Sequence, residues 1–473
     1  MRAVPFVTGR LAVGALATML AFFGGLTPNY PLAGTAMARE VSGDAIRLDI
    51  NEARRLAAIM LRDGQSGDAR TLALGLLKRD PRDVDALLIL AQSEFRLGNL
   101  DQAVRAGRGA FAAAGTDAAR YQAAHVTAAA LNLDGAHTRS QIWLRRAAQH
   151  APDDGSRQQV RRDFRSVAAA NPLEFSLNFG LRPSSNVNNG SQHDTEQLGG
   201  LTRVLDGSEK ALSGLEYSLD ADLRYRLSES KRRRFWVGAS ALGLGYALSD
   251  EAKTIAPNAR AQDFSYLKAG VNLGADLRDA SGRGETLFQF SLAQVWSGGH
   301  RTTHSAEVSA TRRHLISPTA QLQLRASAEK RWNPKRPIED SVILTLSGSW
   351  QKRLVSGAQL GLELGVSDSD SDSYRTASKA VFAGASLSLA KPVLGAETNL
   401  WARMQMRDFD LPFLVFDARE DTRISIGTTL FFRDLDYYGF APTLDIGYSR
   451  SRSNIGAYDG RSFGVGVGVR SVF

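Results

Sequence analysis

The stretch "LEYSLDADLRYRL", residues 215–227, carries the pattern that decides the fold. Seven apolar side chains occupy its odd positions, and glutamate, serine, aspartate or arginine occupies every even position. Successive side chains on a β-strand point to opposite faces, so this segment forms a strand with one apolar face and one charged face. Such a strand needs an apolar surrounding on one side and water on the other.

The same alternation recurs along the whole second half of the chain. With residues 215–227 it makes fourteen segments, mostly 9–14 residues long, and the other thirteen are 173–181, 235–248, 264–277, 286–297, 304–315, 320–330, 341–353, 358–366, 377–389, 396–406, 421–432, 441–450 and 462–473. A tilted strand crosses a bilayer in about 10 residues. The segments therefore predict a transmembrane β-barrel of about fourteen antiparallel strands.

The connections between these segments alternate in length. Short even-numbered links include "SESKRRR" and "ISPT", and the long, polar odd-numbered links are 182–214, 249–263, 331–340, 367–376, 407–420 and 451–461. Outer-membrane barrels have short periplasmic turns and longer external loops, and an even strand count leaves both barrel ends in the periplasm. A soluble β-sandwich is the alternative, but these long strands and this asymmetry of the loops argue against it.

The last segment, "RSFGVGVGVRSVF" at 461–473, alternates to its final residue. The last strand must pair with the first, because an unpaired sheet edge inside lipid is prohibitively costly. Its apolar face would meet lipid, and its terminal aromatic resembles the signal by which barrel-assembly machinery recognises outer-membrane barrels. We expect this barrel-insertion signal to comprise Phe463, Val465, Val467, Val469 and Phe473.

Barrels of eight strands have an interior filled by side chains, and barrels of sixteen to eighteen strands enclose an open channel. A barrel of fourteen strands is intermediate in size. Its lumen could pass an extended chain or a small solute but not a folded domain. The charged positions of the segment quoted first would line this lumen and keep it wet: Glu216, Asp220, Asp222 and Arg224.

The first half of the chain is helical and repeats itself. Ala57, Gly64 and Ala69 recur 34 residues later as Ala91, Gly98 and Ala103, and a third copy holds Ala128, Gly135, Ala147 and Pro152. A 34-residue helix–turn–helix repeat with small residues at these positions resembles the tetratricopeptide family. A plain helical bundle with chance spacing is the alternative.

Stacked helix pairs of this kind present a concave face that binds peptides or other extended partners. On the register of the tetratricopeptide family, a client-binding groove would draw on Arg54, Arg62, Gln92, Phe95, Arg96, His125 and Asn132. We expect residues 39–170 to form this periplasmic repeat domain, ending in a capping helix at 156–170, and residues 171–473 to form the barrel.

The beginning of the chain has the features of an export signal. Arg2 and Arg10 precede the apolar run 11–26, and Ala36-Met37-Ala38 forms a small-x-small cleavage site. These features predict a secretory signal peptide over residues 1–38; an uncleaved anchor is the alternative, with an apolar run short for a span. The chain has no cysteine, so it holds neither disulfides nor thiolate metal sites and is not itself a lipoprotein.

No arrangement of side chains indicates catalysis, a metal or a cofactor. His300 and His304 share a strand face without a third ligand nearby, and Asp368, Asp370 and Asp372 lack the glycine and the glutamate of a calcium loop. The net charge is +9, but the basic residues are not organised on an element that could read a nucleic-acid groove, so nucleic-acid binding is not indicated. Lipid headgroups or a client protein are the better partners. We predict that the protein is not an enzyme and has no cofactor.

The two ends of the barrel resemble a known family. "NFGLRPSSNVNNGS" (178–191) and "DLDYYGFAPTLDIGYSRSRSNIGAYDGRSFGVGVGVRSVF" (434–473) are similar to the first and last parts of the barrel in surface lipoprotein assembly modulators, the Slam family. This resemblance implies delivery of lipoproteins, or in some members soluble client proteins, to the outer face of the outer membrane. The repeats would engage the client, and the barrel would be the conduit or the insertion platform.

Taken together, the sequence predicts a multidomain α + β protein, with helical tetratricopeptide-like repeats followed by a barrel in the outer membrane. The expected function is that of an assembly or translocation factor. Its expected partners are a client lipoprotein or secreted protein, outer-membrane lipids and the barrel-assembly machinery. An outer-membrane porin or polysaccharide-export channel with periplasmic repeats is the alternative, and a barrel enzyme lacks any Ser/His/Asp constellation.

Overall fold

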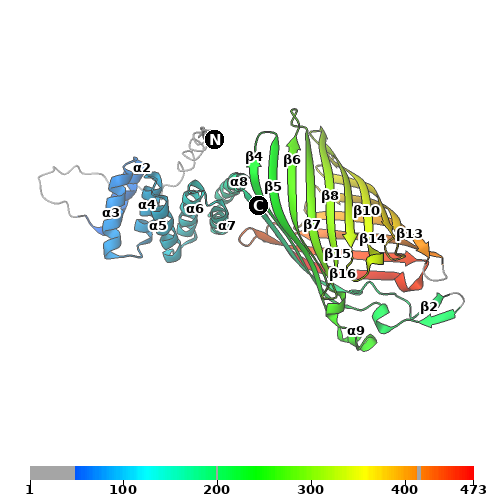
Figure 1. The fold of residues 1–473 in the computed structure, drawn as a ribbon. Coiled ribbons are helices and arrows are strands. Elements are labelled where there is room, and N and C mark those ends of the chain that lie inside the picture. The colour runs from blue at the N-terminus through cyan, green and yellow to red at the C-terminus, as the bar shows by residue number, and fades with distance from the viewer. Residues whose placement is uncertain (1–47, 199–200, 413–416, 473) are drawn as a thin grey trace, which may run out of the picture. The chain divides into compact units, whose positions relative to one another are not determined.

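A computed structural model describes residues 48–198, 201–412 and 417–472. The expected signal peptide, residues 1–38, and Phe473 lie outside this part of the chain. The contacts divide the chain between Asn171 and Pro172 into a helical unit and a strand unit. Figure 1 shows both, and each is described by itself.

The described part of the first unit consists of seven helices: α2 (Ile50–Arg62), α3 (Ser66–Arg79), α4 (Val84–Arg96), α5 (Leu100–Ala113), α6 (Asp117–Leu133), α7 (His137–Gln149) and α8 (Asp154–Ala170). The side chains of Asp49, Asp83, Thr116 and Asp153 cap every second helix by accepting a hydrogen bond from a backbone N–H of the first turn. The caps therefore recur with the helix pairs.

Small residues make these pairs possible. Gly64, Gly98 and Gly135 follow the first helix of three successive pairs, and their φ angles of 84°, 80° and 77° lie in the left-handed region that favours glycine. The repeated alanines at 57, 69, 91, 103, 128 and 147 are each at most 1% exposed. Their burial lets the paired helices approach each other closely.

Fourteen of the described strands form one closed antiparallel barrel: β1 (Leu173–Ser184), β4 (Gly214–Glu229), β5 (Arg233–Leu248), β6 (Tyr266–Arg278), β7 (Gly284–Ser297), β8 (His300–Ser317), β9 (Ala320–Trp332), β10 (Ser341–Arg353), β11 (Gln359–Ser371), β12 (Ser378–Ser388), β13 (Glu397–Pro412), β14 (Ala418–Phe431), β15 (Phe440–Ser453) and β16 (Gly460–Ser471). Each strand pairs with its neighbours in the chain, and β1 pairs with β16. The predicted fold class is confirmed. Among the described residues, no helix combines the length and the apolar character needed for a membrane span.

The two ends of the barrel differ, and we name them by their connections. The long-loop end holds the link 185–213, with the hairpin of β2 (Thr195–Leu198) and β3 (Leu201–Val204), and the link 249–265, with α9 (Asp250–Ile255). The short-turn end holds Leu173, where β1 begins, and links as short as 318–319. The sequence overestimated several long links, because strands continue further than the apolar alternation does.

Two predicted loops are corrected by this continuation. β11 runs to Ser371, so Asp368 and Asp370 lie on a strand and not in the loop expected at 367–376. β13 runs to Pro412, inside the loop expected at 407–420. Between β7 and β8 only Gly298 and Gly299 remain as a link. The backbone ladder does not require apolar side chains, so it can extend into polar sequence.

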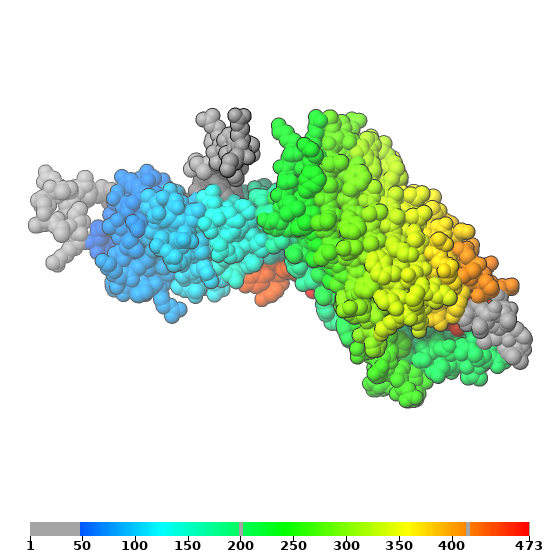
Figure 2. All heavy atoms as spheres, viewed as in Figure 1, coloured from blue at the N-terminus to red at the C-terminus, as the bar shows by residue number. Residues whose placement is uncertain are grey.

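The outer surface of the barrel is a wall of apolar side chains. On β4, Leu215, Tyr217, Leu219, Leu223 and Tyr225 are 37–47% exposed. Leucine, valine, isoleucine and phenylalanine are exposed at matching positions of the other strands. The space-filling view shows the outer surface formed by the strands coloured green to yellow (Figure 2). A surface of this kind and size is solvated by lipid.

Candidate functional site

The inner face of the barrel is identified by an ion pair across the lumen. Lys268 Nζ, on β6, lies 3.3 Å from Glu329 Oε1, on β9. These strands are separated by β7 and β8 in the sheet, so the pair must cross the interior. Lys268 stands opposite Leu242, which stands opposite Asp220 on β4. Because directly opposed residues share a face of a sheet, Asp220 lies on the inner face as well.

The other predicted lumen residues share that face of β4 with Asp220, since they are separated from it by even numbers of residues. Glu216 Oε1 lies 3.0 Å from Nη2 of Arg182 on β1. Asp222 Oδ1 lies 3.0 Å from Arg224 Nε, and the Arg224 guanidinium lies over the indole ring of Trp236 on β5, 4.6 Å from its centre. The four predicted lumen residues thus share the inner face of β4.

A polar cavity of about 440 Å³ lies inside the barrel towards the long-loop end. Residues from six consecutive strands, β8 to β13, line it together with four residues of the links between them, and those with charged side chains are Glu329, Arg331, Glu339, Arg375 and Arg407. Glu329 joins Lys268 to Arg331, whose Nη2 lies 2.7 Å from Glu329 Oε2. At about 30 Å³ per water, the cavity has room for roughly 15 waters. It can hold a hydrated solute or an extended polar segment.

The long-loop end is covered by folded segments that the sequence did not single out as a site. Asn188 Nδ2 donates to Lys210 O (2.7 Å) and Ser208 O (2.9 Å), and its Oδ1 accepts from Leu212 N (2.9 Å). Asn186 Nδ2 donates to Arg461 O of β16 (3.1 Å). Both asparagines belong to the Asn-Val-Asn-Asn sequence 186–189, within the stretch 178–191 that carries the family resemblance. Its physical role is to fasten the link 185–213 over the barrel.

Charged groups hold the same link together. Arg203, on β3, lies 2.6 Å from Glu196 and 2.9 Å from Glu209, measured between nitrogen and oxygen. Its hydrogen bonds hold the pKa of the Glu209 carboxyl below its usual value. Glu196 is 4% exposed and also accepts from the N–H of Ala457, in the link between β15 and β16. These contacts join the first and last long loops of the barrel.

The predicted groove residues of the helices occupy different environments. Arg54 Nη2 pairs with Asp83 Oδ2 at 2.7 Å, Arg96 donates to the carbonyl of Leu61, and exposed Arg62 lies beside Asp63. Gln92 is 6% exposed, and Phe95 packs on the cluster of Ala91, Ala106 and Val126. Contact of these residues with a client stays a prediction.

The remaining two groove candidates lie further along the helical unit. Asn132 Oδ1 is 2.8 Å from His137 Nδ1. His125 is 2% exposed, its Nε2 lies 3.0 Å from Asp163 Oδ2, and its ring stacks on Tyr121. This pair connects α6 to α8, the last helix before the barrel.

The residues of the predicted insertion signal lie along the outer face of β16. Phe463, Val465, Val467 and Val469 are 51%, 38%, 54% and 48% exposed, and they alternate with inward glycine and serine. The fifth member, Phe473, lies beyond the described residues. A role in recognition by assembly machinery stays a prediction.

The rejected metal candidates have other surroundings. His304 stacks on Trp332, with ring centres 5.8 Å apart, on the outer face of β8 and β9. On the next strand Trp350 stands opposite Leu322, near the short-turn end. Asp368 stands opposite Lys379 on the outer face of β11. Across residues 48–198, 201–412 and 417–472, no three histidine or carboxylate side chains form a group that could hold a metal ion.

Comparison with known proteins gives three results. A bacterial polysaccharide outer membrane secretin has 8% sequence identity and a TM-score of 0.32, and the match covers 63% of this chain and 98% of that one. OccAB2 of Acinetobacter baumannii has 8% identity and a TM-score of 0.35, with 62% and 97% covered. A BenF-like porin from Pseudomonas fluorescens has 8% identity and a TM-score of 0.35, with 63% and 98% covered. TM-scores this low support no statement on function.

No curated protein matches the sequence significantly. The profile of the family described as "Surface lipoprotein assembly modifier" matches residues 174–470, which is nearly the whole barrel and more than half of the chain. This match confirms the resemblance drawn from the two ends of the barrel. The closed barrel of fourteen strands and its apolar outer wall are those of an outer-membrane protein. The chain therefore belongs to the family of surface lipoprotein assembly modifiers.

Proposed function

We propose that this protein delivers lipoproteins to the outer face of the outer membrane. The observation that carries the proposal is the family match over residues 174–470, on a closed barrel whose inner face is charged. In this function the helical repeats engage the client in the periplasm, and the barrel is its conduit or insertion platform. The long-loop end then faces the outside of the cell.

The inner face of the barrel suits passage of an extended polar chain. Its carboxylates and guanidinium groups pair with each other, as Glu216 does with Arg182 and Glu329 with Lys268 and Arg331. Paired charges hold water in the lumen but give a passing chain no single strong attachment point.

The helical unit suits client capture because of its architecture. Stacked helix pairs present a long surface to an extended partner. The exposed Arg62 and Arg96 project from the ends of α2 and α4. Cationic side chains near a helix C-terminus are favoured by the helix dipole, and here Arg62 lies beside Asp63 and Arg96 donates to the carbonyl of Leu61.

Deletion of residues 39–170 behind an intact export signal tests the proposal. The shortened protein is expected to insert as a barrel, which is checked by its heat-dependent gel mobility. Surface display of a co-expressed client lipoprotein, measured by antibody labelling of intact cells, is expected to be abolished. Normal display by the shortened protein would contradict client capture by the repeats. Conductance with ordinary solute selectivity, and no client displayed by the full-length protein, would favour the porin alternative.

A further inference from the structure

The seam that closes the barrel has an incomplete backbone ladder. β1 pairs with β16 at four positions, Phe179↔Val469, Gly180↔Gly468, Leu181↔Val467 and Ser184↔Gly464, whereas its other edge pairs with β4 at all twelve of its residues. The ladder to β16 is interrupted at Arg182 and Pro183. The interruption lies inside the strand, since Ser185 N–H donates to Phe463 O at 3.0 Å beyond it.

A proline explains the interruption. Ser185 directs its N–H towards β16, and backbone groups along a strand alternate between its two neighbours, so position 183 points the same way. Pro183 has no N–H to donate, and one rung of the ladder is absent. On the facing strand the inner positions are Gly464, Gly466 and Gly468. No side chain of β16 therefore interlocks with β1 from inside the lumen at these positions.

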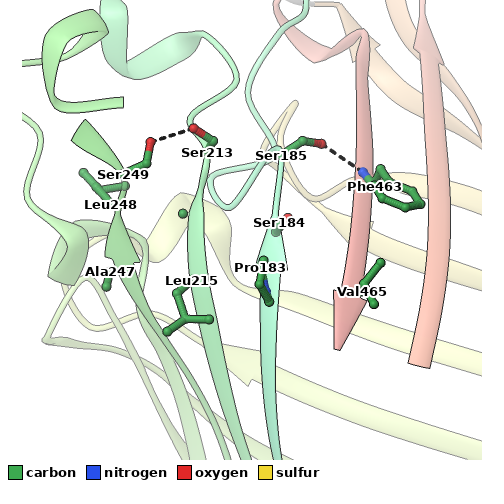
Figure 3. Close-up of a pocket in the computed structure, with 11 residues that line it drawn as sticks. Pro183, Ser184, Ser185, Ser213, Leu215, Ala247, Leu248, Ser249, Phe463 and Val465 are labelled. Atoms are coloured by element: carbon green, nitrogen blue, oxygen red, sulfur yellow. Dashed lines mark hydrogen bonds between the residues drawn. The ribbon is translucent and has the colours of Figure 1, made fainter. Parts of the chain in front are cut away.

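An apolar groove lies on the outer wall at the same place. It has a volume of about 580 Å³ and is lined by Pro183 of β1, Leu215 of β4, Ala247 of β5, and Phe463 and Val465 of β16. Figure 3 shows these side chains around the groove, with hydroxyl groups only at its long-loop end, where Ser213 bonds Ser249 and Ser185 accepts from Phe463 N. The groove thus extends over β1 from β5 and β4 to β16, at the place where the ladder between β16 and β1 is broken.

We propose that the β1–β16 seam opens sideways and that this groove receives the acyl chains of the client lipoprotein. The inference rests on the proposed function. A lipoprotein combines a polar body, which needs the wet lumen, with acyl chains whose every CH₂ group favours lipid over water. Only a slit in the barrel wall lets both parts cross together. The seam supplies the slit, and the groove supplies an apolar surface beside it.

Pairs of cysteines test whether the seam opens, because the chain has no cysteine of its own. Leu181→Cys with Val467→Cys locks the closing seam when oxidised, and Leu181→Cys with Tyr217→Cys locks the neighbouring β1–β4 seam as a matched control. Both pairs stand directly opposite each other in the sheet, at about 4.5–5.5 Å between Cα atoms, within the range of a disulfide.

Oxidation of the closing-seam pair is expected to lower surface display of the acylated client at least tenfold, with recovery in reductant. The control pair should display it at the rate of the reduced protein. A client whose acylated cysteine has been removed should pass both locked barrels. Unchanged display of the acylated client by the protein with the locked closing seam would overturn the inference. So would an equal loss of display when the control pair is oxidised, or an equal loss for the unacylated client.

If the wild-type chain displays no client, the proposed function fails and this inference fails with it. If the wild-type chain displays its client but the locked seam does not block display, only this inference fails and the proposed function stands.

Pro183→Ala provides a second measurement, because it adds the backbone N–H that is missing from the ladder. It should slow display several-fold and leave insertion intact. Pro442→Ala is the matched control, because Pro442 lies on β15, where its carbonyl accepts from Phe432, the residue that follows β14. Wild-type display by Pro183→Ala would contradict the role of the absent rung.

Discussion

Replacement of Asp163 by alanine should loosen the end of the helical unit nearest the barrel in sequence. The carboxylate is 4% exposed, and its oxygens accept from Gln159 Nε2 at 2.8 Å and lie 3.0 Å from His125 Nε2. Without this acceptor, the buried His125 on α6 and the half-buried Gln159 on α8 each lose a hydrogen bond. Each costs about 1–3 kcal/mol when left unsatisfied, so the free energy of unfolding should fall by about 3 kcal/mol.

This loss corresponds to a drop of about 10 °C in the melting temperature of a unit of this size. Circular dichroism at 222 nm of the full-length protein in detergent follows the helices selectively, because the barrel contributes little helical signal. Asp163→Asn retains one acceptor oxygen and should lose about 1 kcal/mol. Asp154→Ala, an exposed change on the same helix, is the control and should shift the transition by less than 3 °C.

A double-mutant cycle separates the pair from its surroundings. If the pair is coupled as its geometry indicates, His125→Ala combined with Asp163→Ala should be less damaging than the sum of the single changes by about 1–2 kcal/mol. Full additivity of the two changes, or a shift below 3 °C for Asp163→Ala, would refute the reasoning.

Three further outcomes follow from the barrel and its loops. Gly274→Ala places a Cβ 2.1 Å from the Trp236 ring and should lower the temperature at which the barrel unfolds on a gel, since overpacking costs about 1–3 kcal/mol. Asn188→Ala removes four hydrogen bonds, three of them to residues 208–212, and should expose the link 185–213 to protease on intact cells. Acid should open the link 185–213 only below about pH 4.5, because Arg203 lowers the pKa of the Glu209 carboxyl. Above that pH the ionised carboxylate stabilises the folded link fully. This stabilisation is lost as the pH falls and the carboxylate becomes protonated.

Matched variants control these measurements. Gly243→Ala adds a Cβ that meets only Leu267 Cδ1, at 3.7 Å, and should leave barrel unfolding unchanged. Gln197→Ala removes a single exposed hydrogen bond to Thr202 and should not change protease cleavage. Cleavage that rises steadily between pH 8 and pH 5 would contradict the role assigned to Glu209.

The barrel could be predicted from the sequence because its information is local. The alternation of apolar and polar residues within each strand, as in residues 215–227, indicates its two faces. The apolar face must be continuous because it contacts lipid. The ends of strands could not be predicted as well. Asp368 and Asp370 read as loop residues, yet they continue β11 beyond the apolar band, where only the backbone ladder decides the structure.

The candidate sites depend on contacts that alternation does not encode. The role of Asn188 comes from three bonds to residues 20–24 positions away, and the pair of Lys268 with Glu329 joins strands that are not neighbours. In the helices, the tetratricopeptide register selected His125 by position alone. The structure instead buries it against Asp163, which lies 38 residues further along the chain.

Two outward tryptophans on adjacent strands, Trp332 of β9 and Trp350 of β10, indicate the thickness of the apolar band. Trp350 stands level with Leu322 across the sheet, ten residues before Trp332 on β9. Ten residues of strand rise about 33 Å, and a tilt of about 40° reduces this to about 25 Å along the membrane normal. Indole rings prefer the headgroup level. The protein therefore fits a thin hydrocarbon slab, and a thicker bilayer would stretch or tilt it.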